Sequence, residues 1–273
     1  MKISGIKVIY FSPTGGTKKL AQKFASRIAE KLCVPVEEIN ITLPDARKEK
    51  YSSGLDELVI LACPTYAGRV PNKIEPNLRT MFRFGGSPAI ALVSFGNRSC
   101  GTAPEELADI LSSAGAVPFA YGAFVCRHAF SETLAKKRPD REDRAELESF
   151  ADRAAETLLN AEDTGKLVSL SGEIGPYYRP LKEDGTPAAF LKAKPLTREK
   201  DCYYCGFCVR VCPMGSIDRD CINVSGICIK CQACVRGCPT RAKYFDDPDF
   251  LSHVRMLEKN FAERAENKTV FGE

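Results

Sequence analysis

Hydrophobic residues gather in short continuous runs along the first half of the chain. Residues 6–11 read IKVIYF, and further apolar runs occupy 34–41, 57–63, 88–95 and 117–126. Runs of this length, bounded by turn residues, are typical of strands buried on both faces of a parallel sheet. The pattern therefore predicts five strands.

Amphipathic segments separate these apolar runs. Within residues 17–32, Leu20, Phe24, Ile28 and Leu32 form one stripe at helical spacing. Strands that alternate with helices imply an α/β fold with a doubly wound parallel sheet. Further helices are predicted near 71–84, 104–114 and 142–160.

The first predicted strand is followed directly by a loop of hydroxyl residues and glycines. The glycines let the backbone approach a ligand, the helix start offers free N–H groups, and the hydroxyls donate to phosphate oxygens. The loop lacks the triphosphate and dinucleotide fingerprints, which leaves a terminal monophosphate. An ordinary capped helix after a tight turn is the alternative. The expected phosphate-binding residues are Ser12, Thr14, Gly15, Gly16 and Thr17.

This loop resembles the phosphate loop of flavodoxins, which bind flavin mononucleotide (FMN). The resemblance covers about residues 4–160. It implies a flavodoxin-like sheet of five parallel strands in the order 2-1-3-4-5, with FMN outside the carboxyl ends of the strands. The loops after the third and fourth strands emerge on that edge, so we expect the flavin ring there. Their candidate FMN-binding residues are Pro64, Thr65, Tyr66, Ala67, Gly68, Ser94, Phe95, Gly96, Asn97 and Arg98.

Side chains of these loops suggest how the ring is held. Tyr66 is the best candidate to stack on it and Phe95 the second, with plain packing as the alternative. Arg69 and Arg98 occupy the same loops, and a cation near the ring favours an anionic reduced flavin. His128 follows the fifth predicted strand and is either a proton donor or a structural histidine. No catalytic residue is assigned.

The C-terminal part carries the pattern C-x2-C-x2-C-x3-C-P twice. Three thiolates at this spacing hold one iron–sulfur cubane, and the fourth ligates the neighbouring cubane. Structural zinc needs two separated ligand pairs, and disulfides need an oxidising compartment, so both fit less well. The sequence predicts two [4Fe–4S] clusters. Their expected ligands are Cys202, Cys205, Cys208, Cys212, Cys228, Cys231, Cys234 and Cys238.

Residues 198–245 resemble the bacterial two-cluster ferredoxins. The resemblance implies that Cys238 completes the set of the first motif and Cys212 that of the second. Gly206 stands where many such ferredoxins carry glycine, but the matching position of the second copy is Gln232, which affects packing. Cys221 lies between the motifs and is either a small buried residue or a spare ligand.

The length and composition fit two domains, and two bound clusters would offset the formal positive charge of the chain. The chain has 273 residues, 44% of them hydrophobic, and a formal net charge of +4. Two thiolate-ligated clusters at about −2 each would bring this sum to roughly zero, so we expect no nucleic-acid partner. No signal peptide and no apolar run of about 20 residues is visible, so we expect a cytoplasmic protein without membrane insertion.

The predicted organisation has four parts. An FMN-binding flavodoxin-like domain occupies residues 1–163, and an irregular linker rich in glycine and proline occupies 164–197. A small α+β ferredoxin-like domain with two clusters follows at 198–247. Residues 248–273 form a C-terminal helix and tail, with the helix expected over 249–268 to dock on one domain.

The whole chain resembles flavodoxin–ferredoxin fusion proteins of the EFR1 type, found mainly in anaerobes. Cubanes pass single electrons and flavin stores a pair, so together they connect one- and two-electron chemistry. The resemblance implies an electron-transfer protein that serves a redox partner protein. The alternative is an FMN-dependent reductase that delivers electrons to a small-molecule acceptor and is fed by its own clusters.

Overall fold

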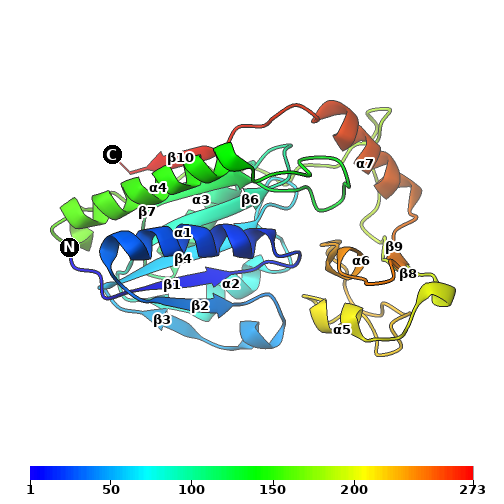
Figure 1. Cartoon of the computed structure of the whole chain (residues 1–273), viewed down its shortest axis with the longest axis horizontal. Coiled ribbons are helices and arrows are strands. Elements are labelled where there is room, and N and C mark those ends of the chain that lie inside the picture. Colours follow the sequence, from blue (N-terminus) through cyan, green and yellow to red (C-terminus); the bar gives the residue numbers. More distant parts are fainter. Residues whose placement is uncertain (273) are drawn as a thin grey trace.

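The computed structural model describes residues 1–272 and arranges them in two units (Figure 1). The sheet unit contains residues 1–160 and the C-terminal strand. The cysteine unit contains residues 196–245 and lies beyond the carboxyl ends of the sheet strands (Figure 1). Among residues 1–272, no helix combines the length and the apolar character needed to cross a membrane.

The main sheet has six strands in the order β10-β7-β6-β4-β1-β2. The five strands from the predicted apolar runs pair in parallel. β10 adds antiparallel to the β7 edge, so the sheet is mixed and larger than the five-stranded parallel sheet expected. The strands are β1 (Gly5–Tyr10), β2 (Val36–Asn40), β4 (Glu57–Pro64), β6 (Pro88–Phe95), β7 (Val117–Val125) and β10 (Lys268–Phe271).

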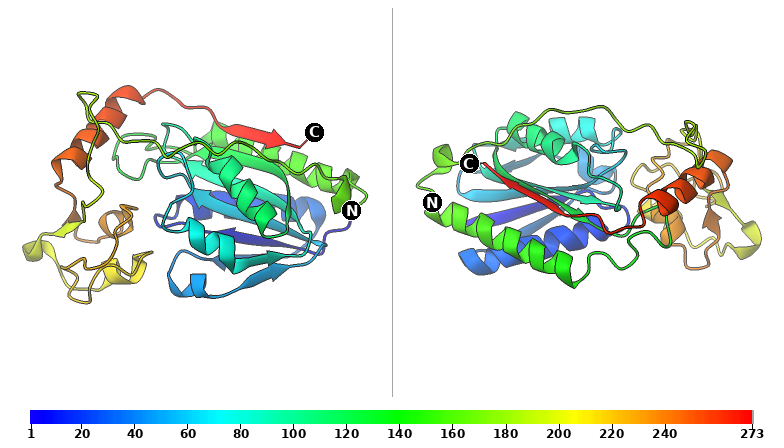
Figure 2. Two further views of the ribbon diagram at one scale, coloured as in Figure 1. Left: turned by 180° about the vertical axis from the view of Figure 1, so that it is seen from behind. Right: turned by 90° about the horizontal axis from the view of Figure 1, so that it is seen from above.

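Helices cover both faces of this sheet, as Figure 2 shows. α1 (Gly16–Leu32) and α4 (Arg141–Asn160) cover one face, and α2 (Glu75–Met81) and α3 (Ala103–Ser113) cover the other. The region predicted as one helix over 71–84 also contains a short strand, which pairs with another short strand outside the main sheet. These two are β3 (Tyr51–Ser53) and β5 (Phe82–Phe84).

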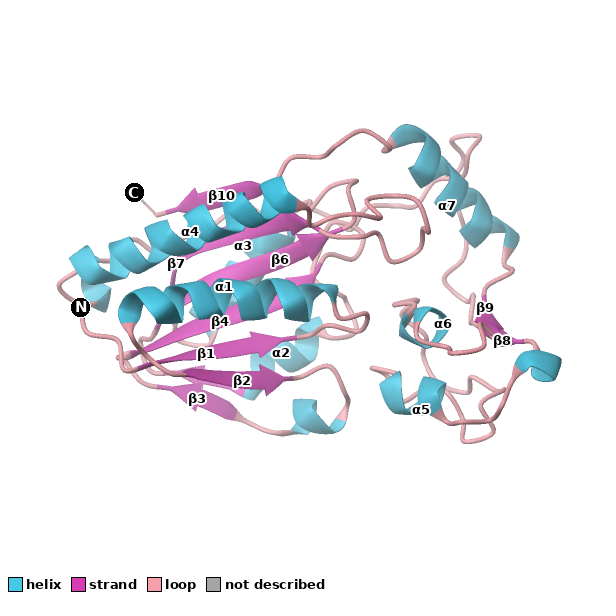
Figure 3. Ribbon diagram, in the orientation of Figure 1, coloured by secondary structure: helices cyan, strands magenta, loops and turns pink. Residues whose placement is uncertain are grey.

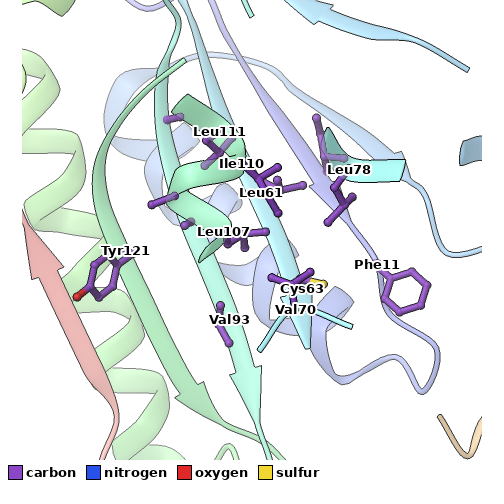
Figure 4. Close-up of a cluster of buried hydrophobic side chains, with 14 of the residues drawn as sticks. Phe11, Leu61, Cys63, Val70, Leu78, Val93, Leu107, Ile110, Leu111 and Tyr121 are labelled. Atoms are coloured by element: carbon purple, nitrogen blue, oxygen red, sulfur yellow. The ribbon is translucent and has the colours of Figure 1, made fainter. Parts of the chain in front are cut away.

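Each face of the sheet has its own hydrophobic core, because successive strand residues point to opposite faces. In β4, Leu61 and Cys63 belong to the core under α2 and α3, whereas Leu58 and Ile60 belong to the other core. Figure 4 shows Leu107 and other α3 side chains in the first of these cores. Burial on both faces explains why these strands read as continuous apolar runs.

The chain leaves the sheet unit and returns to it, as Figure 3 shows. Residues 167–195 form an irregular strap that joins the two units after a short 3-10 turn at Thr164–Lys166. The predicted C-terminal helix ends earlier than expected, because α7 covers only Pro248–Asn260. The remaining residues run back to β7 and form β10. The cysteine unit is therefore attached to the sheet unit at both of its ends.

The cysteine unit contains two copies of one backbone pattern. Tyr204 and Gly206 in the first copy have positive φ, as do Lys230 and Gln232 in the second. Its elements are β8 (Leu196–Thr197), the 3-10 turn η3 (Glu199–Asp201), α5 (Phe207–Val211), α6 (Ala233–Arg236) and β9 (Lys243–Tyr244). β8 and β9 pair antiparallel and close the unit.

Candidate functional site

The loop after β1 brings the predicted phosphate-binding residues to the start of α1. Gly15 has φ 83°, and neither a capping side chain nor an acidic residue occupies the first turn of α1. The Ser12 hydroxyl accepts a hydrogen bond from the Lys18 N–H at 2.9 Å, which shapes the loop. Thr14 is exposed. The first turn of this helix therefore retains N–H groups and a positive dipole end suited to an anion.

Two of the predicted hydroxyls are used inside the protein. Thr17 is buried, and its Oγ1 lies 2.7 Å from Oγ of buried Ser94. This contact fixes the phosphate loop to the end of β6. The two hydroxyls therefore position the loop, and the anion-binding groups that remain are backbone N–H groups and the hydroxyls of Ser12 and Thr14.

The loop after β4 carries an unsatisfied hydroxyl and a half-buried tyrosine, Tyr66. Thr65 Oγ1 is buried and has no hydrogen-bond partner among the described residues. Burial raises the pKa of Tyr66 well above its ordinary value, and electrostatic repulsion from Cys231, Cys63 and Cys228 adds to the rise. Tyr66 therefore lies within electrostatic range of Cys228 and Cys231 of the second motif. A buried oxygen without a partner at this loop is suited to a polar ligand atom.

The strap covers the outer side of this loop. The Tyr178 N–H donates to the Ala67 carbonyl at 2.8 Å, and the Tyr177 hydroxyl donates to the Val70 carbonyl at 2.8 Å. Gly68 lies against Gly101, where an added Cβ at Gly101 would approach the Gly68 carbonyl oxygen to 2.3 Å. Pro64, the remaining predicted residue of this loop, ends β4.

The two arginines predicted near the flavin ring have different surroundings. Arg69 forms a two-pronged ion pair with buried Glu106, with both N···O distances 2.6 Å. This pair neutralises its charge, so Arg69 is poorly placed to stabilise an anionic flavin. Arg98 has no hydrogen-bond or ion-pair partner in the described part of the chain, and its guanidinium lies 3.8 Å from the centre of the Tyr178 ring. Burial lowers the pKa of Arg98.

The loop after β6 packs against His128. An added Cβ at Gly96 would approach His128 Cδ2 to 2.4 Å, so this position requires glycine. The Asn97 amide faces the C-terminal segment, where it donates to the Phe261 and Glu263 carbonyls at 2.6 and 2.7 Å. Phe95 is buried in the core beneath the loop. Of the five predicted residues in this loop, Arg98 therefore has a polar side chain that makes no hydrogen bond or ion pair with the described residues.

His128 is a neutral structural histidine at neutral pH. Burial lowers its pKa to about 4, and the charges of His253, Arg236 and Arg98 add to this effect. Its Nδ1 accepts a hydrogen bond from the Phe130 N–H at 3.1 Å. A group with this pKa carries no proton on that nitrogen to donate at neutral pH, so the structural interpretation of His128 fits better than the proton donor.

The eight motif cysteines line two separate cavities. Cys202, Cys205, Cys208 and Cys238 line the distal cavity. Cys212, Cys228, Cys231 and Cys234 line the proximal cavity. Each cavity thus takes three cysteines from one motif and the fourth from the other. Within residues 1–272, no group of three or more His, Cys, Asp or Glu side chains converges so as to hold a single metal ion.

Backbone N–H groups point at the cysteine sulfurs. The N–H of Tyr204 lies 3.4 Å from Cys202 Sγ, and that of Lys230 lies 3.4 Å from Cys228 Sγ. Ser216 N–H approaches Cys212 Sγ at 3.3 Å. Such contacts stabilise sulfur in its thiolate form, which is the form that ligates metal.

The two cavities differ in their distance from the sheet unit. Met214 and Ile229 line the proximal cavity and also pack against the hydrophobic core under α2 and α3. At the distal cavity Cys205 is exposed, and Tyr203 and Tyr204 are 79% and 55% exposed. The proximal cavity therefore faces the sheet edge, and the distal cavity faces outward.

Two arginines join the units, and neither was predicted. Arg47, at the 3-10 turn η1 (Asp45–Lys48), donates to the carbonyl of Pro213, next to Cys212. Arg236 of α6 donates to the Ala129 carbonyl at 2.8 Å and to the carbonyls of His128 and Ser131 at 2.5 and 2.7 Å. Arg47 thus holds the end of the first motif to the turn after β2, and Arg236 holds the second motif against the loop that follows β7.

Lys243 is a further residue that the sequence analysis missed. It lines the distal cavity, and only 3% of its surface is exposed. The spacing of the two motif copies contained a signal, because Lys243 stands five residues after Cys238 just as Ile217 stands five residues after Cys212. Cys221, predicted as a buried residue or a spare ligand, is buried and also lines the distal cavity.

Comparison with known proteins gives fold-level similarity alone. No model of a protein family matches the sequence, and no curated protein matches it. A flavodoxin from Streptococcus pneumoniae TIGR4 shares 21% identity over 56% of this chain and 99% of its own, with a TM-score of 0.41. A flavodoxin from the domain Archaea shares 20% identity over 57% of this chain and 99% of its own, with a TM-score of 0.40.

An NADH:FMN oxidoreductase, EmoB in its apo form, shares 17% identity over 60% of this chain and 94% of its own, with a TM-score of 0.42. At these identities and TM-scores the similarities assign no function.

Proposed function

We propose that this protein is an electron-transfer protein that binds FMN at the sheet edge and two [4Fe–4S] clusters in the cysteine unit. The observation that carries the proposal is the composition of the two cavities, each lined by four motif cysteines with the fourth exchanged between motifs. When bound, the clusters supply one-electron chemistry and the flavin joins it to two-electron chemistry.

The cysteine cavities fit cubanes chemically. All eight motif cysteines are free of disulfides. Each cavity offers four sulfur ligands, and backbone N–H groups at sulfur distance add the hydrogen bonds that such clusters use. The Tyr204 N–H serves the distal cavity, and the N–H groups of Lys230 and Ser216 serve the proximal cavity. Each motif copy needs the other to complete its ligand set, so the two sites would assemble together.

The sheet edge fits a flavin monophosphate. The uncapped start of α1 offers N–H groups without a competing carboxylate, and Thr14 adds a hydroxyl. In a doubly wound sheet, ligands bind outside the carboxyl ends of the strands. Thr65 and Tyr66 lie at that edge, where they would meet the polar rim and the face of the ring.

The arrangement of these sites supports a route through the molecule. Tyr66 lies near Cys228 and Cys231 of the proximal cavity, whereas the distal cavity reaches the surface at Cys205. Electrons would therefore enter or leave at the distal cavity and pass the proximal cavity on the way to the sheet edge. A redox partner protein would dock over Tyr203 and Tyr204.

The alternative is an FMN-dependent reductase of a small acceptor, which requires access to the flavin ring. Tyr177 and Tyr178 of the strap bond to the loop after β4, and the cysteine unit lies beyond the sheet edge. This covering favours the carrier over the reductase.

The decisive test is the cofactor content of the full chain purified without oxygen. We expect about eight iron, about eight sulfide and one FMN per chain. Thr14→Asp places a carboxylate in the phosphate loop and should remove flavin while iron is retained. Ser113→Asp, at the far end of α3, is the matched control and should retain both. Absence of iron in the wild-type protein would refute the proposal.

A further inference from the structure

Lys243 is a buried cation without a partner. It belongs to β9, opposite Thr197 of β8, and its exposed fraction is 3%. Its ammonium nitrogen has no hydrogen-bond partner in the described part of the chain, and no carboxylate there lies within ion-pair distance. Leaving a buried ammonium unpaired costs several kcal/mol. Such a group points to an anionic partner in the space it faces.

The space it faces is the distal cavity. Lys243 lines that cavity together with Cys202, Cys205, Cys208 and Cys238. Its charge acts on the sulfur of Cys208 in this cavity and also reaches Cys234, which lines the proximal cavity. Asp220, the acidic group that also feels this charge, uses its exposed carboxylate to accept from the Ile222 and Asn223 N–H groups. The anionic partner of Lys243 would therefore be a ligand bound in the distal cavity.

The proximal cavity differs at the equivalent position. Ile217 stands there, buried to 5% exposure, and supplies no charge. Lys230 also lines the proximal cavity, but its ammonium donates to the carbonyls of Leu191 and Cys228 at 2.6 and 3.1 Å. Both cavities therefore border a buried lysine, and they differ in that the Lys230 ammonium is hydrogen-bonded to carbonyl oxygens whereas the Lys243 ammonium has no partner among the described residues.

We propose that Lys243 is the counter-cation of the distal [4Fe–4S] cluster and makes that cluster easier to reduce. This inference rests on the proposed function. Adding one electron makes the contents of the cavity one charge more negative, with no bond formed or broken. The ammonium stabilises the reduced cluster more than the oxidised cluster, because the Coulomb attraction grows with the negative charge of the cluster. The distal cluster would then be easier to reduce than the same cluster without this charge.

The test is a redox titration of the full chain followed by spin-resonance spectra, with dithionite as the one-electron reductant. Lys243→Met should lower one of the two midpoint potentials, with a change of about tenfold in the reduction equilibrium constant, or ~59 mV for one electron. Lys243→Arg keeps the charge and should leave both potentials close to those of the wild-type protein. Lys200→Met removes an equal charge from an exposed position of the same unit and should cause a much smaller, salt-screened shift.

Each outcome decides between charge and packing. If Lys243→Met loses iron while Lys243→Arg retains it, the positive charge is required to hold the cluster, which supports its role as the counter-cation. If both variants lose iron, or if Lys243→Met retains two clusters at unchanged potentials, the inference is wrong. Absence of iron and sulfide from the wild-type protein would refute the proposed function itself, so the two failures are distinguishable.

Discussion

The two units of this protein are built on different kinds of interior. The sheet unit buries aliphatic and aromatic side chains on both faces of its sheet, including Phe24, Ile60 and Leu92. The buried apolar group of the cysteine unit consists of Cys208, Ile217, Cys221 and Cys234. A small unit whose interior is mostly sulfur gains little from hydrophobic burial. The sheet unit thus has a large apolar interior to stabilise it, whereas the cysteine unit should depend on the clusters proposed for its cysteines.

The largest expected effect follows from removing iron. Since metal-binding free energy is folding free energy in small metal-dependent domains, the cysteine unit should unfold while the sheet unit persists. Hydrogen exchange measured before and after anaerobic chelation should show protection falling roughly 100-fold or more in residues 196–245. Amides of β1, β4 and β6 should keep their protection. Equal loss in both units would contradict the comparison.

A substitution in the hydrophobic core should destabilise the sheet unit instead. Phe24 is fully buried and stacks on Phe150 with 4.9 Å between ring centres. Phe24→Ala should lower the free energy of unfolding of this unit by about 3–5 kcal/mol, because it leaves a cavity. Denaturant unfolding followed by circular dichroism measures this loss.

Two controls define the meaning of that loss. Leu159→Ala removes a side chain that is 57% exposed and should change stability by about 0.5 kcal/mol or less. Iron content should stay constant in both variants. A Phe24→Ala protein that folds normally but cannot retain iron would show that the interior of the cysteine unit depends on the sheet unit.

Weakening the contact between the two units, where α6 meets the loop after β7, should have an intermediate effect on stability. Arg236 donates to three backbone carbonyls of residues 128–131. Arg236→Met leaves these carbonyls without their charged donor and should weaken local closure by about 2–3 kcal/mol. Hydrogen exchange in residues 127–134 reports this opening. Arg210→Met is the control, because Arg210 is exposed and donates to the Cys205 carbonyl within its own unit.

Lowering the pH should weaken the same contact between the units, by less than the Arg236→Met substitution does. The pKa of His128 is lowered to about 4 by burial, and the charges of His253, Arg236 and Arg98 oppose its protonation. The unfolded segment therefore binds more protons than the folded one between pH ~6.5 and ~4, so stability is lost as pH falls through this window. We expect protection of residues 127–134 to drop about tenfold from pH 7 to pH 5. His128→Gln should abolish this dependence if His128 causes it.

The sequence predicted those parts of the fold whose signals are local. The apolar runs that became β1, β4, β6 and β7 were found nearly to the residue, because strands buried on both faces need no partner to be recognised. β10 was missed, since its four residues become a strand through pairing with β7. The predicted helix continued past Asn260 for the same reason.

The candidate site shows the same division. Motif spacing predicted the three cysteines that each cavity takes from one copy, because that spacing is local in the chain, and the resemblance to two-cluster ferredoxins implied the exchange of the fourth. The neutralisation of Arg69 by Glu106 was not predicted, since the two residues are 37 positions apart. The burial of Lys243 likewise depends on how β8 and β9 close the cysteine unit.

The smallest expected effect compares the two motif copies at one backbone position. Gly206 has φ 70° and Gln232 has φ 67°, a left-handed conformation that costs little for glycine and more for a residue with a side chain. Gln232 is buried, and its side-chain amide donates to the Lys230 carbonyl at 3.2 Å. That bond offsets part of the strain, so Gln232→Gly should stabilise the cysteine unit by about 0.5 kcal/mol.

The reciprocal change tests the same reasoning. Gly206→Gln should destabilise the unit by about 1 kcal/mol, because an added Cβ would lie 3.0 Å from Arg210 Nη1 as well as in the strained conformation. The rate of iron loss to a chelator measures both variants. A slower loss in Gln232→Gly and a faster one in Gly206→Gln would show that backbone strain, and not the identity of the motif copy, distinguishes the two sites. Faster loss in both would mean that the Gln232 side chain is itself a structural part of the proximal cavity.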